Sequence, residues 1–330
     1  MNRSTPGLKI SKAIPGFLQY KSAEALSPST LESYRKHLEQ WFAYLGDKDV
    51  KKITPQEIRA YLVWLQTEYK PHRFGGNEQR LSPKTVHNVW ISLSAFFSWA
   101  NREFNFPSPM KMVPRPKFEV ALIEPFTKEE IEVLLTACDY SHEAKTERRR
   151  KFVMRRFTAY RDRAVILFLL DTGLRSSELC ALKIGDVDQK TGKVTIKHGA
   201  TGGAKGKKGR VVYMGKSTRR ALWRYLATRE DADDSETSLF LGKFYRPLNK
   251  GVLRQLLARL GDKAKVVKVH PHRFRHTFAI TYLRSNGDLF TLKALLGHSS
   301  LDMVQHYARI AQVDIEAAHR RASPADNWHL

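Results

Sequence analysis

Residues 270–280 read HPHRFRHTFAI, and they place an unusual set of side chains on one predicted helix. His272, Arg275 and His276 share one face of that helix, because residues three and four positions apart are neighbours along a helical surface. Two imidazoles and a guanidinium are rich in charge, yet they are interspersed with apolar residues: Phe274, Phe278 and Ile280. A helix that served only the core would not contain this set, so the pattern indicates a functional site.

A second stretch, LLGHSSLDMVQHYARI at residues 295–310, supplies two more candidates. His298 follows a turn marked by glycine, and Tyr307 comes nine residues later. The two stretches together offer arginine, histidine and tyrosine side chains without a pair of carboxylates. Such a set suits an anionic substrate such as a phosphodiester.

The composition indicates a nucleic acid as the first candidate partner. The 330-residue chain carries a formal net charge of +24 and has a pI of about 10.0, although a ribosome-associated or merely basic enzyme is the alternative. Its two cysteines, Cys138 and Cys180, lie in apolar helical patterns and are expected to be buried thiols rather than a disulfide or a metal site. Neither a signal peptide nor an apolar run of membrane-spanning length is evident, so we expect a cytoplasmic, nucleoid-associated protein.

The chain is long enough for two domains. Helix-start patterns of a hydroxyl residue followed by proline begin at Ser27, Thr54 and Ser82, and a short helix is expected over 14–20. These elements predict a small helical bundle that ends before a proline-rich segment at 105–125. The predicted organisation is a first domain over 1–115, a linker over 116–126 and a second domain over 127–330.

A glycine-rich segment, GATGGAKGKKG at residues 199–209, lies between two predicted strands, 194–197 and 210–214. It does not match a nucleotide-binding P-loop, because Lys208 stands where that motif needs serine or threonine. A flexible hairpin tip that carries lysines is the better interpretation. Lys207 and Lys208 would then contact a phosphate backbone or remain solvated.

These motifs, taken in order, resemble the tyrosine recombinase/integrase family of the Xer and phage-integrase kind. The elements that carry the resemblance are DTGLRSSEL at 171–179, Lys205, HRFRH at 272–276, LGH at 296–298 and Tyr307. One such box would be a weak signal, and Arg175 alone would indicate a surface arginine at a capped helix. Five such motifs in the family's order are a strong signal. The resemblance is close over residues 120–312 and looser over 14–115.

The resemblance implies a mainly α fold with a small β-hairpin or sheet in the catalytic domain. It implies a two-domain, C-shaped DNA clamp, in which an N-terminal SAM-like helical bundle binds the core of the DNA site. Arg80 and Lys84 are our best candidates for DNA contact in that bundle, although they could form an ordinary solvated face. Residues 141–156, SHEAKTERRRKFVMRR, are either a solvated insert or an additional DNA-facing patch.

The resemblance also implies roles for the motif residues. Arg175 and Arg275 would grip the non-bridging oxygens of a DNA phosphodiester, since guanidinium binds phosphate in a bidentate fork. Tyr307 would attack the phosphorus and form a 3′-phosphotyrosine. Lys205 is assigned as the general acid, with Lys207 and Lys208 as the alternatives for that role. The remaining assignments are proton transfer for His272, a phosphate hydrogen bond for His298 and orientation of the site for Glu178.

We expect no cofactor and no metal. The covalent link conserves the energy of the phosphodiester, so ATP is not needed, and the acidic cluster of a magnesium-dependent nuclease is missing from the motifs. A zinc site is disfavoured, because no cysteine accompanies the histidines and Arg275 stands among them.

Three functions remain open from the sequence. The first is a site-specific recombinase that acts as a homotetramer on paired sites in double-stranded DNA and can be a monomer when free. The second is a type IB topoisomerase-like enzyme, and the third is a non-enzymatic DNA-binding protein. We expect a Xer-like or transposon-type recombinase, because the chain corresponds to a clamp and a catalytic domain without the additional amino-terminal module of some phage integrases.

Overall fold

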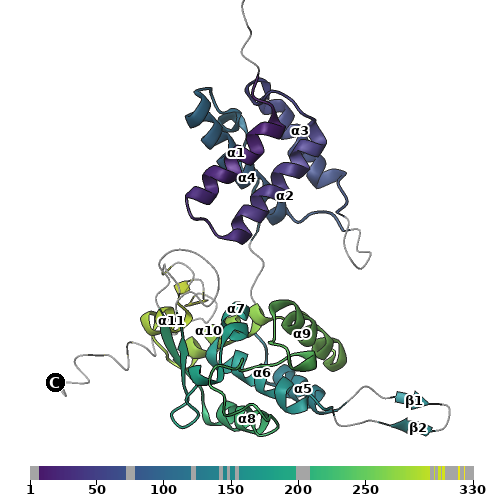
Figure 1. Ribbon diagram of the computed structural model, residues 1–330, viewed down its shortest axis with the longest axis vertical. Helices are drawn as coiled ribbons and strands as arrows, with labels where there is room; N and C mark the ends of the chain where they lie inside the picture. Colours follow the sequence, from purple (N-terminus) through teal and green to yellow (C-terminus); the bar gives the residue numbers. More distant parts are fainter. Residues whose placement is uncertain are drawn as a thin grey trace, which may run out of the picture. The chain divides into compact units, whose positions relative to one another are not determined.

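The computed structural model describes residues 7–71, 79–119, 124–140, 144–146, 149–152, 156–197 and 209–297, with positions 301, 304, 305, 307, 308, 319 and 323 beyond them. The chain divides near residue 121 into two compact units (Figure 1). Within the described ranges, no helix combines the length and the apolar character needed to cross a bilayer.

The first unit is a bundle of helices. Its α-helices are α1 (Ile10–Ala23), α2 (Pro28–Leu45), α3 (Pro55–Thr67) and α4 (Pro83–Phe104), with short 3₁₀ turns at Val50–Lys52 and Pro109–Met112. Ser27, Thr54 and Ser82 each cap a helix through the side-chain oxygen, and proline follows each at the first helical position, where no amide donor is needed. The three predicted helix starts are confirmed, whereas α1 begins before the predicted residue 14 and continues through Pro15.

Aromatic side chains make up much of the core of this bundle. Phe17, Trp41, Phe96 and Phe97 are fully buried. The ring centroids of Trp41 lie 5.7 Å from Phe96 and 5.6 Å from Phe97 in edge-on arrangements, the geometry that ring quadrupoles favour. The aromatic positions at helical spacing therefore act as core residues.

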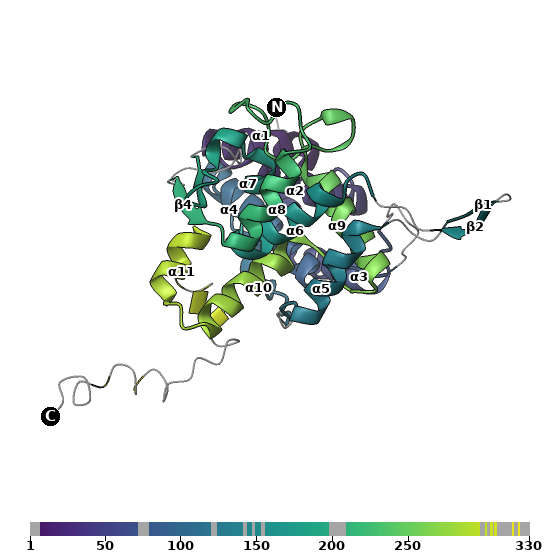
Figure 2. The same ribbon diagram turned by 90° about the horizontal axis from the view of Figure 1, so that it is seen from below.

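The second unit surrounds the apolar helix α6. Its α-helices are α5 (Lys128–Asp139), α6 (Ala159–Thr172), α7 (Ser176–Ala181), α8 (Lys216–Leu226), α9 (Lys250–Ala264), α10 (Pro271–Arg284) and α11 (Leu289–Leu296), with 3₁₀ turns at Ile184–Asp186 and Lys243–Tyr245. Helix α6 packs against α5, α8 and α10 (Figure 2). Because Val165, Ile166, Phe168 and Leu169 are all fully buried, α6 is covered on several faces at once, which explains why its sequence lacks a polar stripe.

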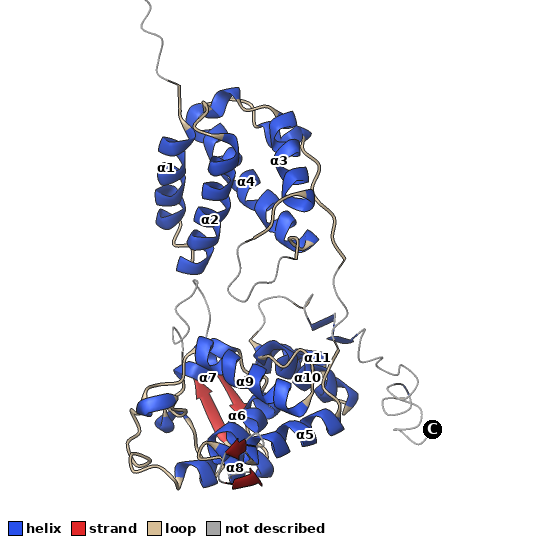
Figure 3. Cartoon of the chain, turned by 90° about the vertical axis from the view of Figure 1, so that its right-hand side faces the viewer, coloured by secondary structure: helices blue, strands red, loops and turns tan. Residues whose placement is uncertain are grey.

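Two small antiparallel sheets complete the unit (Figure 3). Strands β3 (Lys193–Ile196) and β4 (Arg210–Tyr213) pair in the predicted place, with Lys193 opposite Tyr213 and Ile196 opposite Arg210. Strands β1 (Ala144–Thr146) and β2 (Arg149–Phe152) form a hairpin that the sequence did not predict, because its residues are mostly charged.

The apolar pair at residues 239–240 predicts a short strand from the sequence, and this prediction is wrong. This segment makes only isolated bridges on either side, Lys183 with Ser238 and Leu241 with Pro247. Two buried apolar residues in sequence suggest a strand, but here they serve as core residues of a loop. The mainly α fold class with a small β-hairpin is nevertheless confirmed.

Candidate active site

Helix α10 presents different side chains to different partners. His270 caps the helix, with its Nδ1 accepting the Arg273 amide at 3.2 Å, and Pro271 follows at the first position. Phe274 enters the core, where its ring centroid lies 4.6 Å from that of Phe126. Arg273 is a structural residue, because it pairs with Glu130 at 2.8 Å. The histidines and Arg275 lie on the remaining face, as the sequence predicted.

Arg275 is buried and joins two turns of the chain. Its Nη1 donates to the carbonyl of Gly173 at 2.8 Å, and its Nη2 donates to the carbonyl of Leu296 at 2.7 Å. Only 3% of the residue is exposed, and this burial, together with the charge of Arg175, lowers its pKa to about 10. A guanidinium with that pKa is still charged at neutral pH, so the site holds a buried positive charge.

Arg175 reaches the same region from the turn after α6. Gly173 ends α6 with φ of 59°, a left-handed conformation, and a Cβ at this position would overlap the ring of Phe278. This tight turn places Arg175 at the start of α7, where Nη2 donates to the carbonyl of Gly297 at 3.2 Å. Both motif arginines therefore hydrogen-bond to the end of α11.

Glu178 holds two arginines in place. Its carboxylate accepts Arg175 Nη1 at 3.0 Å and two hydrogen bonds from Arg210, at 2.8 and 2.7 Å. Burial by itself would raise the pKa of Glu178, but the hydrogen bonds and charges of Arg210 and Arg175 outweigh it and set the pKa at about 2. The carboxylate is thus ionised throughout the physiological range.

Sequence reasoning missed Arg210. It is the first residue of β4 and also donates from Nε to the carbonyl of Leu295 at 2.7 Å. An arginine at a strand end resembles an ordinary surface residue, and its partner Glu178 is distant in sequence. The available signal was its position directly after the glycine-rich segment, at the start of the second predicted strand.

Tyr307 is buried beside His276 of α10. Its phenol oxygen lies 2.8 Å from His276 Nδ1, and only 1% of the residue is exposed. The ring centroids of His272 and His276 are 5.9 Å apart. His276 had no assigned role in the sequence prediction, although it was placed on this face.

Burial and neighbouring charges shift the pKa values of Tyr307 and His272 in opposite directions. Burial raises the pKa of Tyr307, while the charges of Arg275 and Arg175 act to lower it. Burial and the same two arginines lower the pKa of His272, although the residue as a whole counts as exposed. At neutral pH the cluster therefore contains a protonated phenol, a neutral His272 and positively charged guanidiniums.

The structure describes only some of the other predicted site residues. Lys205, Lys207, Lys208 and His298 lie outside the described residues. Arg80 and Lys84 are exposed in the first unit, next to the start of α4, and Lys84 Nζ is 6.0 Å from the ring centroid of Phe118. Their proposed DNA contacts, like the domain boundaries, stay predictions.

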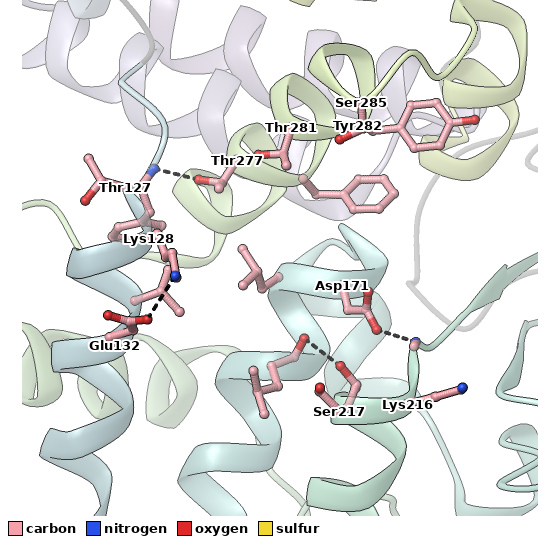
Figure 4. Close-up of a pocket in the computed structure, with 17 residues that line it drawn as sticks. Thr127, Lys128, Glu132, Asp171, Lys216, Ser217, Thr277, Thr281, Tyr282 and Ser285 are labelled. Atoms are coloured by element: carbon pink, nitrogen blue, oxygen red, sulfur yellow. Dashed lines mark hydrogen bonds and ion pairs between the residues drawn. The ribbon is translucent and has the colours of Figure 1, made fainter.

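A cavity of about 830 Å³ lies among α5, α6, α8 and the later turns of α10 (Figure 4). Thr277 and Tyr282 line it from α10, and Asp171 accepts the Gly215 amide at 2.6 Å at its edge. Its lining is mainly apolar and differs from the arginine cluster in residues and charge. It is therefore separate from the candidate active site. In the part of the chain described, no group of three or more potential metal ligands is present.

Curated relatives match nearly the whole chain. Tyrosine recombinase XerC of Thermodesulfovibrio yellowstonii is 29% identical over 309 residues, which cover 90% of this chain and 91% of that protein. The XerC of Bacillus subtilis is 28% identical over 304 residues, with the same coverage of 90% and 91%.

Solved structures share the fold at lower identity. The Tn1549 transposon integrase in complex with transposon right end DNA superimposes with a TM-score of 0.72 at 18% identity, covering 96% of this chain and 98% of that one. A lambda integrase dimer bound to a core site gives a TM-score of 0.67 at 18% identity, covering 91% and 95%.

Two family models match this sequence. The N-terminal SAM-like domain of phage integrases matches residues 14–104, and the phage integrase family itself matches residues 124–313. The second match alone covers more than half of the chain. The chain therefore belongs to the phage integrase family, the tyrosine recombinases.

Proposed function

We propose that this protein is a site-specific DNA recombinase that breaks and rejoins strands through a 3′-phosphotyrosine at Tyr307. The observation that carries the proposal is the phenol of Tyr307, which is held 2.8 Å from His276 within the field of Arg275 and Arg175. A nucleophile placed beside fixed guanidiniums suits attack on a phosphodiester.

The charge balance of the cluster supports phosphate binding. Arg175, Arg210 and Arg275 bring three positive charges, and Glu178 supplies one negative charge among them. The arginines are fixed before substrate arrives, because they donate to carbonyls at the ends of α6 and α11. Donors that need no reorganisation stabilise the charge that develops on the phosphate oxygens in the transition state.

The reaction exchanges one ester bond for another. The Tyr307 oxygen gives up its proton and forms a bond to phosphorus, while the bond to the 5′ oxygen of the leaving strand breaks. His276, whose Nδ1 lies 2.8 Å from the phenol oxygen, is the proposed acceptor of the phenol proton. The leaving 5′ oxygen takes up a proton. Lys205 is the proposed donor of this proton, His272 assists its transfer, and His298 is proposed to bind a phosphate oxygen. The 5′ hydroxyl of a partner strand then loses its proton and attacks the phosphotyrosine, and the bond from phosphorus to Tyr307 breaks as the phenol oxygen takes a proton back.

Because each step conserves the ester bond, we propose that no ATP, metal or other cofactor takes part. The proposed partner is double-stranded DNA with paired recombination sites, bound by a homotetramer. The curated relatives are named tyrosine recombinases, and XerH, which shares the fold, was solved bound to its difH substrate. The proposal places the protein in the cytoplasm with the DNA.

Trapping on a nicked duplex tests the proposal. The nick lies so close to the cleavage point that the leaving strand diffuses away and the covalent adduct accumulates. Duplexes drawn from the DNA that flanks the gene serve as substrates, and a random duplex serves as the control. A slowly migrating protein–DNA band is expected on a denaturing gel.

Tyr307→Phe should abolish this band, whereas Tyr213→Phe, at a phenol that is 60% exposed on β4, should keep it. An adduct that persists in Tyr307→Phe would refute the choice of nucleophile. Absence of an adduct in the wild type, despite binding of the same duplex, would refute the enzymatic proposal. Recombinant joints with two duplexes, rather than relaxed supercoils alone, separate recombination from topoisomerase activity.

A further inference from the structure

The loop before α9 exposes two neighbouring aromatic side chains. Phe244 is 86% exposed and Tyr245 is 78% exposed. Both have positive φ, 55° and 56°, a left-handed conformation that residues with a Cβ avoid. Single exposed apolar residues are common on protein surfaces, but a turn alone would favour glycine or asparagine here. Aromatic residues that persist on a strained backbone point to a function.

The base of this loop is anchored to the fold. The Leu241 amide donates to the hydroxyl of Tyr225 at 3.1 Å, and its carbonyl accepts Arg161 Nη1 at 3.1 Å. The Gly242 amide donates to the carbonyl of Arg246 at 2.7 Å and closes the loop. Because the base is ordered by these bonds, the aromatic pair would lose little backbone freedom on binding a partner.

Exposed cations continue from the loop along α9. Arg246 follows the aromatic pair, Lys250 is the first residue of α9, and Arg254 lies one turn further. A helix rises about 1.5 Å per residue, so the last two are about 6 Å apart along its axis, close to two base-pair steps of 3.4 Å. Aromatic side chains flanked by such cations suit a nucleic acid better than an acidic protein. A nucleic acid offers phosphates to the cations and apolar base surface to the aromatic rings.

This surface adjoins the candidate active site. Helix α9 packs against α7, the helix that Arg175 begins (Figure 1). Arg254 also lies near the start of α10, since its charge contributes to the lowered pKa of His270. A duplex held at Arg175 and Arg275 would therefore pass along α9.

We infer that Phe244 and Tyr245 contact base edges in the major groove of the DNA next to the cleavage point, and that thymine is the base they favour. The major groove exposes the thymine methyl group, which apolar side chains recognise by contact. Arg246, Lys250 and Arg254 hold the adjoining phosphates. The uncharged pair thus adds sequence preference, and the cations add affinity for any sequence. The inference rests on the proposed function.

Selection from a library of random duplexes tests this inference. The full chain selects its preferred sequences, and the profile is compared with that of the double variant Phe244→Asn/Tyr245→Asn. Asparagine tolerates the left-handed conformation, so the melting temperature should not fall. We expect the variant to lose its preference for thymine at one or two adjacent positions, by about tenfold at each, while its salt dependence stays unchanged.

Two further variants separate the roles. Arg246→Gln/Lys250→Gln should bind all sequences more weakly and with a shallower salt dependence, as removal of two phosphate contacts requires. Trp223→Ala is the matched control, because this side chain is 62% exposed on α8, away from α7 and α9 (Figure 1). Its profile should equal that of the wild type.

An unchanged profile in the asparagine double variant would overturn the inference. Equal loss of affinity for every sequence would also overturn it, as would a wild-type profile without any preference. The covalent adduct of the wild type distinguishes this failure from failure of the proposed function. An adduct with an unchanged variant profile refutes only the role of the aromatic pair, whereas no adduct on any selected duplex refutes the recombinase.

Discussion

Replacement of Glu178 by glutamine should destabilise the protein in a pH-dependent manner. The folded pKa of Glu178 is about 2, against an ordinary value of 4.5, and the residue is 4% exposed. At about 1.4 kcal/mol per pKa unit, the ionised carboxylate contributes about 3 kcal/mol at pH 7. Glu178→Gln keeps the shape of the side chain and removes this contribution.

The dependence on pH follows from the direction of the shift. The folded pKa is depressed, so the contribution is complete above the unfolded pKa of 4.5 and is lost as the pH falls towards the folded value of about 2. About 1.4 kcal/mol should already be lost at pH 3.5. The difference between wild type and Glu178→Gln in free energy of unfolding should therefore shrink below pH 4.5.

Urea denaturation at pH 7, 5, 4 and 3.5 measures this difference. Glu132→Gln is the control, because its carboxylate is 61% exposed and lies 3.7 Å from Lys128, so its removal should cost less than about 0.5 kcal/mol. A difference that stays constant from pH 7 to 3.5, or that is below about 1 kcal/mol at pH 7, would refute the electrostatic account.

The partner of Glu178 offers an independent check. Arg210→Met leaves the carboxylate without its bidentate partner and should cost about 3–5 kcal/mol. The double variant Glu178→Gln/Arg210→Met should cost less than the sum of the two single variants, because both remove one interaction. Strand cleavage by Glu178→Gln should also fall, by roughly 100-fold, since Arg175 loses the group that positions it. Additive costs would show that the pair does not act as a unit.

Two further variants test the turn and the nucleophile. His276→Ala should slow formation of the covalent adduct about tenfold without weakening DNA binding. His276→Asn should restore part of the rate, because the asparagine amide lies near the position of Nδ1, 2.8 Å from the Tyr307 oxygen. Equal rates of wild type and His276→Ala in single-turnover trapping would contradict this role. Gly173→Ala should lower the free energy of unfolding by more than about 2 kcal/mol, because the alanine would have a left-handed φ and its Cβ would overlap Phe278. A urea midpoint equal to that of the wild type would show that this position is not strained.

Local patterns in the sequence were sufficient for most of the fold. Hydroxyl residues followed by proline marked the starts of three helices, since capping and the fixed φ of proline act within one turn. The β3–β4 pair was predicted from two apolar strands around a glycine-rich segment. The β1–β2 hairpin was missed, because its charged residues carry no strand pattern.

The sequence also placed His272, Arg275 and His276 on one face, because helical spacing is a local rule. The partners of these residues depend on contacts between distant segments. Arg275 donates to Gly173, which is 102 positions away, and Arg210 pairs with Glu178, which is 32 positions away. Spacing along the chain cannot encode such pairs, since they exist only after α6, α10, α11 and β4 pack together.

The residue types alone were enough to indicate chemistry on an anionic phosphodiester. They could not show that Tyr307 is buried against His276, or that one carboxylate holds two arginines. Burial and charge pairing set the pKa of each group, and both arise from the packing of segments that are far apart in sequence.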